Sequence, residues 1–360
     1  MNKDLRIIQL IDSLDAGGAE RMAVNYANSL VEVISFSALV TTRKEGALKQ
    51  QLFPEVSYLF LNKQGKIGIS AVWKLRTFIK KNKVNILHAH STSFFTAVLV
   101  KLVYPKIKIV WHDHHGNRVH KKGKTNIILK IVSFFFYGIL TVNRELEQWA
   151  KENLFPKKTH YFPNFITSIS NKEVERTVLK GTEGKRIVFL ANLKKPKNHL
   201  QIIKAYANSN ALALGWSLHL IGKDFFDFYS TELKTFIAEN SLQNFVFIYN
   251  SCKDVEFILN QSDIGILGST YEGFPVTLLE YGKARLTVIS TNVGYCSSII
   301  QDSINGILFN PMDSLEITLK LNIILENKSI RLEYATVLRE EVMQHYSEKV
   351  ILKQYLEWLR

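Results

Sequence analysis

Short apolar runs alternate with amphipathic stretches along the whole chain, the pattern of strands that alternate with helices. Each run is apolar almost throughout, as expected for strands that helices cover on both faces. The first half predicts strands at Arg6–Ile11, Val33–Val40, Asn85–His90, Ile107–His112, Ile139–Asn143 and His160–Pro163. The second half predicts strands at Arg186–Asn192, Ser217–Gly222, Phe245–Tyr249, Ile264–Gly268, Thr287–Thr291 and Ile307–Asn310. The fold class that follows is α/β, with two Rossmann-like, doubly wound parallel-sheet domains.

A polar stretch, Asn164–Gly184, separates the two series of strands. We therefore predict an N-terminal domain over residues 1–164, a linker over 165–184 and a second domain over 185–344. Open parallel sheets bind ligands at the carboxyl ends of their strands. We expect the two sheets to face each other across a cleft, with ligand-binding loops on both sides.

Composition excludes several classes of protein. Hydrophobic residues make up 46% and charged residues 22% of the 360 residues, as in ordinary globular proteins. The two cysteines, Cys252 and Cys296, are too few for a disulfide scaffold or a four-thiolate zinc site. The first residues lack a secretory apolar region, and no uncharged apolar stretch reaches 18 residues. We expect a cytoplasmic protein.

Positive charge is concentrated in the first half of the chain. The net charge is +14, and residues 1–180 carry 28 basic and 13 acidic side chains. Within residues 56–144, 16 lysines and arginines stand against a single acid, Asp113. Such a surface favours an anionic partner, which can be a phosphate-bearing acceptor, an acidic membrane surface or nucleic acid.

Two strand-to-helix loops indicate phosphate binding. Gly17 and Gly18 follow the first strand, where adjacent glycines let a ligand approach a helix N-terminus. This loop matches neither the dinucleotide-binding GxGxxG pattern nor the P-loop pattern. The sequence therefore favours phosphate binding and a tight turn without a ligand about equally. In the second half, Tyr271–Glu280 follows the strand Ile264–Gly268, and Pro275 predicts the first turn of a helix there. Its amides suit a diphosphate, while Glu272 and Glu280 can accept hydrogen bonds from hydroxyls, as in a nucleotide sugar.

Lysines and histidines follow other strands of the same two sheets. Lys194, Lys195 and Lys197 come after the strand that opens the second domain, where cations can neutralise a diphosphate. Six of the ten histidines fall within residues 88–120, and His112 ends one of those strands. Metal binding is conceivable for them, but polar lining of a cleft is favoured because no carboxylate cluster joins them.

The apolar segment Asn126–Thr141 contains one lysine. It predicts a buried helix that runs into the strand Ile139–Asn143. A partly exposed face resting on lipid, beside Lys121, Lys122 and Lys124, is compatible with the same pattern.

Four features together resemble the glycosyltransferase family 4 enzymes of the GT-B fold. They are the GGAE loop Gly17–Glu20, the strand that ends in His112 and Asp113, the segment Ala191–His199, and the Glu-x7-Glu spacing of Glu272 and Glu280. They occur in the family's order, and the resemblance runs the length of the chain. It is nearest to bacterial transferases that build capsule, O-antigen or exopolysaccharide.

The resemblance implies a role for each motif. Glu280 should hydrogen-bond the donor ribose, and Glu272 should contact sugar hydroxyls. Lys197 should pair with the diphosphate, and His112 should lie by the reacting sugar, which makes His112, Glu272 and Lys197 the catalytic candidates. The expected donor-binding residues are Gly17, Gly18, Asn192, Lys194, Lys197, Gly273, Phe274, Pro275, Val276 and Glu280. Ala191 and Asn192 stand where many members have Gly-Arg, and Lys194 is the candidate substitute for that arginine.

The resemblance also implies the reaction and its partners. It predicts transfer from a UDP- or GDP-sugar to a saccharide or polyprenyl-diphosphate-linked acceptor, with retention and with neither a metal nor a cofactor. The final helix, about 345–360, should pack on the N-terminal domain. We expect peripheral attachment to the anionic inner face of the cytoplasmic membrane and no nucleic-acid partner. A sugar-nucleotide epimerase, a phosphorylase and a basic nucleic-acid-binding protein are the alternatives.

Overall fold

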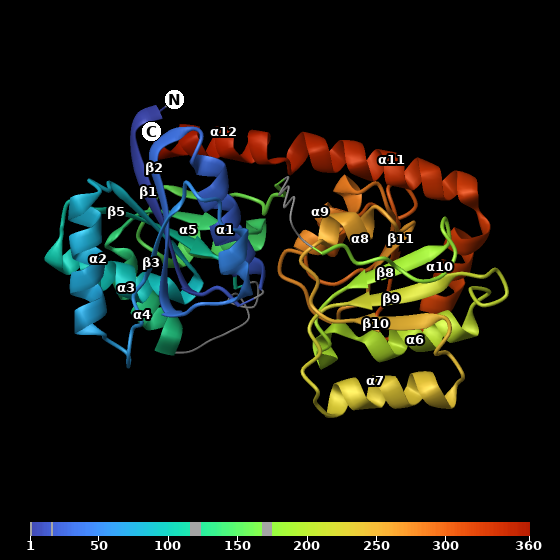
Figure 1. Ribbon diagram of the computed structural model, residues 1–360. Helices are drawn as coiled ribbons and strands as arrows, with labels where there is room; N and C mark the ends of the chain where they lie inside the picture. The colour runs from blue at the N-terminus through green and yellow to red at the C-terminus, as the bar shows by residue number, and fades with distance from the viewer. Residues whose placement is uncertain (1, 16, 116–123, 168–174) are drawn as a thin grey trace. The chain divides into compact units, whose positions relative to one another are not determined.

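The computed structural model describes residues 2–15, 17–115, 124–167 and 175–360 (Figure 1). The chain forms two compact units. Unit 1 comprises Met1–Ile169 together with Ser347–Arg360, and unit 2 comprises Ser170–Tyr346. Phe165 and Ile166 are buried in unit 1, and the backbone of Leu179 donates to Gln261 in unit 2. The connection between the units is therefore shorter than the predicted linker 165–184.

Unit 1 contains a parallel sheet whose strand order is β3-β2-β1-β4-β5-β6-β7. Its strands are β1 (Asn2–Ser13), β2 (Ile34–Lys44), β3 (Ser57–Phe60), β4 (Ile86–His90), β5 (Lys108–Asp113), β6 (Phe136–Thr141) and β7 (Thr159–Tyr161). Its helices are α1 (Gly18–Leu30), α2 (Ile69–Lys81), α3 (Phe94–Val103), α4 (Lys124–Ser133), α5 (Arg144–Asn153) and α12 (Glu348–Leu359). The chain reverses direction across the sheet between β1 and β4, which is the switch point where such sheets bind ligands.

Different helices pack on the two faces of this sheet. Helices α2 and α3 pack on one face, around Ile8, Leu87 and Trp111 (Figure 1). Helices α1 and α12 cover the other face, where Tyr355 packs against the core residue Ile7. The return of the last helix to the N-terminal sheet thus agrees with the expectation for residues 345–360.

Unit 2 contains a second parallel sheet, with the order β10-β9-β8-β11-β12-β13. Its strands are β8 (Arg186–Leu190), β9 (Ser217–Ile221), β10 (Val246–Tyr249), β11 (Ile264–Leu267), β12 (Thr287–Thr291) and β13 (Ile307–Phe309). Its helices are α6 (His199–Asn208), α7 (Phe228–Glu239), α8 (Val255–Leu259), α9 (Val276–Lys283), α10 (Ser314–Glu326) and α11 (Lys328–His345). The reversal lies between β8 and β11. The prediction of two doubly wound parallel sheets is confirmed.

The apolar segment Asn126–Thr141 divides into two elements. It contributes most of α4 and all of β6, which starts at Phe136 rather than at Ile139. Leu129 is buried against the sheet, but Ile127, Ile128 and Ile131 are exposed. The expectation of a buried helix is therefore wrong for most of its turns. Among the described residues, no helix combines the length and the apolar character needed to cross a membrane.

Candidate functional site

Two predicted side chains meet at the switch point of unit 2. Lys197 follows β8 and Glu272 follows β11, and these two strands are neighbours in the sheet. The ammonium of Lys197 lies 2.6 Å from Glu272 Oε1, and both side chains are partly buried. The pair therefore places one cation and one carboxylate at the strand ends where ligands bind in this type of sheet.

Two hydrogen bonds and one close backbone approach hold the loops around this pair. The amide of Thr270 donates to Pro196 O at 2.9 Å and joins the loop after β11 to the loop after β8. Asn198 Nδ2 donates to Pro311 O at 2.9 Å and adds the loop after β13. Gly294 lies so close to Glu272 that a Cβ on it would be 1.8 Å from Glu272 O. The site is thus built from four loops at one edge of the sheet.

Helix α9 begins directly after this loop. Pro275 is its N-cap, so the helix starts at Val276, one residue later than the sequence predicts. No side chain caps the helix, which leaves its first amides open to an anion. Phe274 is buried and stacks on Tyr295, with ring centroids 5.2 Å apart. This contact fixes the Gly273–Val276 turn in front of α9, and Glu280 lies half-buried one turn further along the helix.

Lys194 points elsewhere. Its ammonium lies 4.6 Å from the centroid of the Phe225 ring, in the loop after β9, and the side chain is exposed. The short 3-10 turn at Lys195–Lys197 separates it from Lys197, which is the lysine that reaches Glu272. Lys194 therefore stays a candidate for the role of the arginine in the family pattern, and in this structure it contacts the loop after β9. Asn192 accepts a hydrogen bond from the Lys223 amide at 2.9 Å and joins the loops after β8 and β9.

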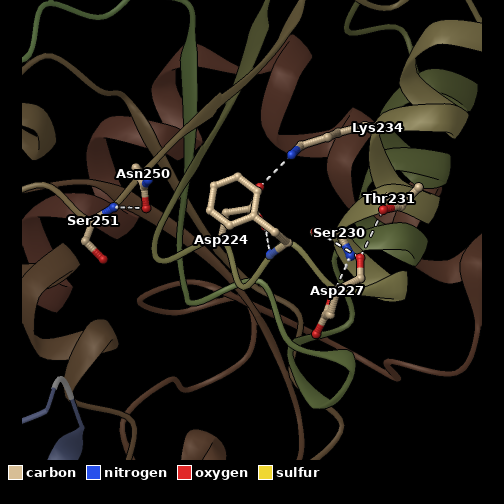
Figure 2. Close-up of polar contacts among 8 residues, drawn as sticks. Asp224, Asp227, Ser230, Thr231, Lys234, Asn250 and Ser251 are labelled. Atoms are coloured by element: carbon tan, nitrogen blue, oxygen red, sulfur yellow. Dashed lines mark hydrogen bonds and ion pairs between the residues drawn. The ribbon is translucent and has the colours of Figure 1, made fainter.

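The loop after β9 is held by its own carboxylates (Figure 2). Asp224 accepts from Lys234 Nζ at 2.6 Å, and Asp227 caps α7 by accepting from the Ser230 amide at 3.0 Å. Both acids are therefore engaged in positioning the loop that carries the partner of Lys194.

Sequence reasoning missed Cys296. The thiol is completely buried beside the Lys197–Glu272 pair. Burial, helped by the Glu272 carboxylate, raises the pKa of Cys296 to about 12, so the thiol stays neutral.

In unit 1, the glycine loop lies at the corresponding switch point. Gly17 is the N-cap of α1, and both Gly17 and Gly18 are exposed. A Cβ on Gly17 would lie 2.3 Å from Glu20 Oε2, whereas one on Gly18 would meet nothing within 4 Å. Gly17 therefore gives the Glu20 side chain room to fold over the first turn of α1.

Three histidines line the same face of this sheet. His88 and His90 on β4 and His112 on β5 are all completely buried. Burial lowers the pKa of each well below its usual value, so all three are neutral at physiological pH. One nitrogen of each lies within 4.8 Å of the others, a spacing that a metal ion could use.

Hydrogen bonds already occupy most of these nitrogens. His88 Nε2 lies 3.3 Å from His112 Nδ1, and His90 contacts His114 at 3.0 Å and Gln9 Oε1 at 2.8 Å. Tyr355, from α12, lies 3.0 Å from His88 Nδ1. Five of the six ring nitrogens of these three histidines thus have hydrogen-bond partners among the described residues, while metal binding and polar lining of a cleft both stay predictions. Tyr355 and Gln9 were not predicted, because neither stands near the histidines in the sequence.

Family models match almost the whole chain. A model described as Glycosyltransferase Family 4 matches residues 16–168, and one described as Glycosyl transferases group 1 matches residues 170–342. The first therefore falls on unit 1 and the second on unit 2.

Individual relatives are distant. One relative from Campylobacter jejuni is 27% identical over 104 residues, which are 29% of this chain and 27% of that protein. It is named N,N'-diacetylbacillosaminyl-diphospho-undecaprenol alpha-1,3-N-acetylgalactosaminyltransferase. A second Campylobacter jejuni enzyme, an alpha-1,4-N-acetyl-D-galactosaminyltransferase acting on a GalNAc-containing PP-undecaprenol, is 23% identical over 91% of each chain. HepE of Anabaena, solved with UDP and glucose, superposes with a TM-score of 0.81 at 17% identity over 99% of each chain. At that identity, the superposition shows a shared fold.

Proposed function

The chain belongs to the group 1, family 4 glycosyltransferases, and we propose that it moves a sugar from a nucleotide-sugar donor to a lipid-linked saccharide during bacterial surface-polysaccharide synthesis. The observation that carries this proposal is the pairing of Lys197 with Glu272 at the start of α9. The undecaprenol-linked acceptors of the two Campylobacter jejuni relatives support a polyprenyl-diphosphate acceptor, and the ligands of HepE support a UDP-sugar. Family membership disfavours the nucleic-acid-binding alternative.

The mechanism we propose is stabilisation of the leaving group. Lys197 turns from Glu272 to the departing diphosphate, while the amides at the start of α9 bind its oxygens. Glu272 is then free to accept hydrogen bonds from the sugar hydroxyls, and Glu280 accepts from the ribose. The acceptor hydroxyl attacks from the leaving-group face, which retains the anomeric configuration without a metal.

A nucleotide-binding experiment tests the donor site. Thermal unfolding is measured with UDP, GDP, ADP and dTDP, each with and without a chelator. A nucleotide at 100 times its dissociation constant stabilises the native state by about 2.7 kcal/mol. We expect one nucleotide to raise the melting temperature, equally with the chelator present. Lys197→Ala should abolish this rise, since it removes the cation that meets the diphosphate.

Lys195→Ala is the matched control, because Lys195 lies in the same turn but is exposed. It should keep the full shift. An equal shift in the Lys197 variant and the wild type contradicts the site, and a shift that the chelator removes contradicts the metal-free mechanism.

We further propose that unit 1 rests on the anionic inner face of the cytoplasmic membrane. Ile127, Ile128 and Ile131 of α4, with Phe134 just beyond it, are between 52% and 73% exposed. Phe134 also packs edge-to-face on the exposed Phe155, with centroids 6.1 Å apart. We call these five exposed side chains the apolar patch, and all of them belong to the basic half of the chain. Each lysine or arginine near an anionic surface adds about 1 kcal/mol of attraction.

Vesicle flotation tests the membrane proposal. The wild type should float with anionic vesicles at low salt, and added salt should release it. The double change Ile131→Ser and Phe134→Ser should reduce binding at least tenfold, because the patch loses two of its five apolar side chains. Phe228→Ser is the control, since Phe228 is 85% exposed in unit 2. Undiminished binding by the double variant contradicts the proposal.

A further inference from the structure

The turn in front of α9 is held through the buried ring of Phe274. Tyr295, from the loop after β12, stacks on this ring with centroids 5.2 Å apart. A second ring, that of Tyr346, contacts Phe274 with centroids 6.0 Å apart and an interplanar angle of 59°. Tyr346 is the C-cap residue of α11, and only 8% of it is exposed. Phe274 is therefore held by aromatic rings from two further elements of unit 2.

Helix α11 packs directly on α9. A Cβ on Gly282 of α9 would lie 2.7 Å from Val342 Cγ2 and 3.1 Å from Leu338 Cγ, so the glycine lets the two helices come close together. The amide of Tyr346 donates to Val342 O at 2.9 Å, which ties the tyrosine to the turn of α11 that touches α9. The same helix thus supports α9 itself and supplies a ring that holds the turn before it.

The loop after β12 is attached to α11 as well. Glu341 accepts a hydrogen bond from Asn305 Nδ2 at 2.6 Å, and the same amide group donates to Ile299 O at 3.0 Å. Ile299 and Tyr295 flank one short 3-10 turn, Cys296–Ser298. Through these contacts α11 also supports the ring of Tyr295. The C-terminal turns of α11 therefore stand behind both aromatic contacts of the turn before α9.

We propose that Tyr346 is a positioning residue for the donor: its ring keeps Phe274 buried and so holds the Gly273–Val276 turn in the conformation whose amides bind the diphosphate. The binding of diphosphate by these amides rests on the proposed function; the contact between the rings does not. A turn that already has its binding conformation need not be ordered by the ligand, which favours affinity. Because the contact is made by the ring of Tyr346, phenylalanine should replace tyrosine there without loss.

Amide hydrogen exchange of the free protein tests the positioning role without a ligand. In Tyr346→Ala, exchange over residues 273–283 should become about tenfold faster, since the turn loses one buried aromatic contact and opens locally more often. Tyr346→Phe should exchange like the wild type. Tyr346→Leu, which keeps apolar volume but lacks the ring, should also exchange faster, and it replaces the alanine variant if that one does not fold.

Tyr334→Ala is the matched control. Tyr334 lies on the same helix and is 9% exposed, but it packs in the main core of unit 2, about 18 Å further back along α11. The change should lower the melting temperature of unit 2 about as much as Tyr346→Ala does. It should leave local exchange over residues 273–283 as in the wild type.

Nucleotide affinity tests the role in donor binding. The dissociation constants of UDP and GDP are measured by titration calorimetry at a temperature at which every variant is folded. Tyr346→Ala should weaken the affinity about tenfold, the loss expected when the turn has its binding conformation only about a tenth of the time. Tyr346→Phe should keep the wild-type affinity, and so should Tyr334→Ala in spite of its lower stability.

The outcomes separate this proposal from the proposed function. Unchanged exchange over residues 273–283 without the Tyr346 ring, or an equal increase in Tyr334→Ala, overturns the positioning role whatever the affinity. Faster exchange with an unchanged nucleotide affinity overturns the link between this turn and the diphosphate. If neither nucleotide binds the wild type, the donor site of the proposed function fails for UDP and GDP, and exchange still decides whether Tyr346 positions the turn.

Discussion

Buried histidines outside the site make unit 2 sensitive to acid. His219 and His199 are completely buried, and burial lowers the pKa of each from 6.5 to about 4. In the unfolded chain both would bind protons near pH 6.5, so their neutral folded state stabilises the protein above that pH. This contribution is lost as the pH falls from 6.5 through about 4.

Acid unfolding should therefore respond to His219. Each such histidine adds a slope of at most about 1.4 kcal/mol per pH unit within that window. His219→Gln, whose amide can still bond Ser217, should reduce the slope of unfolding free energy between pH 7 and 5, measured in urea. His345→Gln, at an exposed position of the same unit, should not. Equal slopes in all three proteins would show that His219 does not titrate on unfolding.

At the level of single residues, site residues could be predicted when they directly follow a strand in the sequence. Lys197 and Glu272 follow parallel strands of one sheet, and the structure brings them within 2.6 Å. Lys194 could not be separated from Lys197 by sequence, because the turn that directs one toward Glu272 and the other toward Phe225 depends on tertiary packing. Tyr355 was invisible for a similar reason: 267 residues separate it from His88.

The loop after β12 is the element that most constrains the candidate site. Gly294 adopts a φ of +57°, and a Cβ on it would lie 1.8 Å from the carbonyl oxygen of Glu272. An alanine at position 294 would have to adopt a backbone conformation that favours glycine. Its Cβ would also clash with the carbonyl oxygen of Glu272, which cannot move without displacing that residue. The glycine thus couples this loop to the position of the carboxylate.

Gly294→Ala should consequently damage both stability and ligand binding. The left-handed conformation alone costs an alanine roughly 1–2 kcal/mol. Gly215→Ala measures that cost by itself, because Gly215 has a φ of +73° and open space around it. We expect Gly294→Ala to lose more unfolding free energy than Gly215→Ala and also to lose the nucleotide-induced shift in melting temperature. Similar effects of the two changes would mean that the contact with Glu272 is not restrictive.

Element types were more predictable than their edges and faces. The buried strands were all recognised, since a run such as Ile264–Leu267 is apolar throughout and fully buried. Strand β3 was missed because Ser57–Phe60 is short and only half-buried at the edge of its sheet. The exposed face of α4 was missed because its apolar composition is that of a core helix.

At the scale of the molecule, unit 1 is assembled from two separate parts of the chain. Ile351, Leu352 and Leu359 of α12 are buried in the same core as Ile7 and Tyr26. Gly138 on β6 leaves room for the Trp358 ring, which a Cβ would approach to 2.6 Å. Helix α12 is thus an integral layer of unit 1.

A protein that ends at Tyr346 should therefore lose the fold of unit 1 and keep that of unit 2. Removing a single buried leucine side chain costs about 2–5 kcal/mol, and α12 carries several buried apolar side chains. Calorimetry should show one transition in place of two, and amide exchange should locate the loss of protection in unit 1. Leu352→Ala, in the intact chain, should lower the unit 1 transition alone. Two undisturbed transitions in the truncated protein would contradict this role of α12.

The divided origin of unit 1 has a consequence for biosynthesis. All of Ser170–Tyr346 must be translated before α12 exists, and at about 5–20 residues per second that takes roughly 10–35 s. Throughout this interval, the part of the unit 1 sheet that α12 later covers is exposed to solvent as an apolar surface. Unit 2 can already fold during this time. Production of this protein should accordingly depend on chaperones that shield nascent chains, and slow elongation within unit 2 should increase its aggregation.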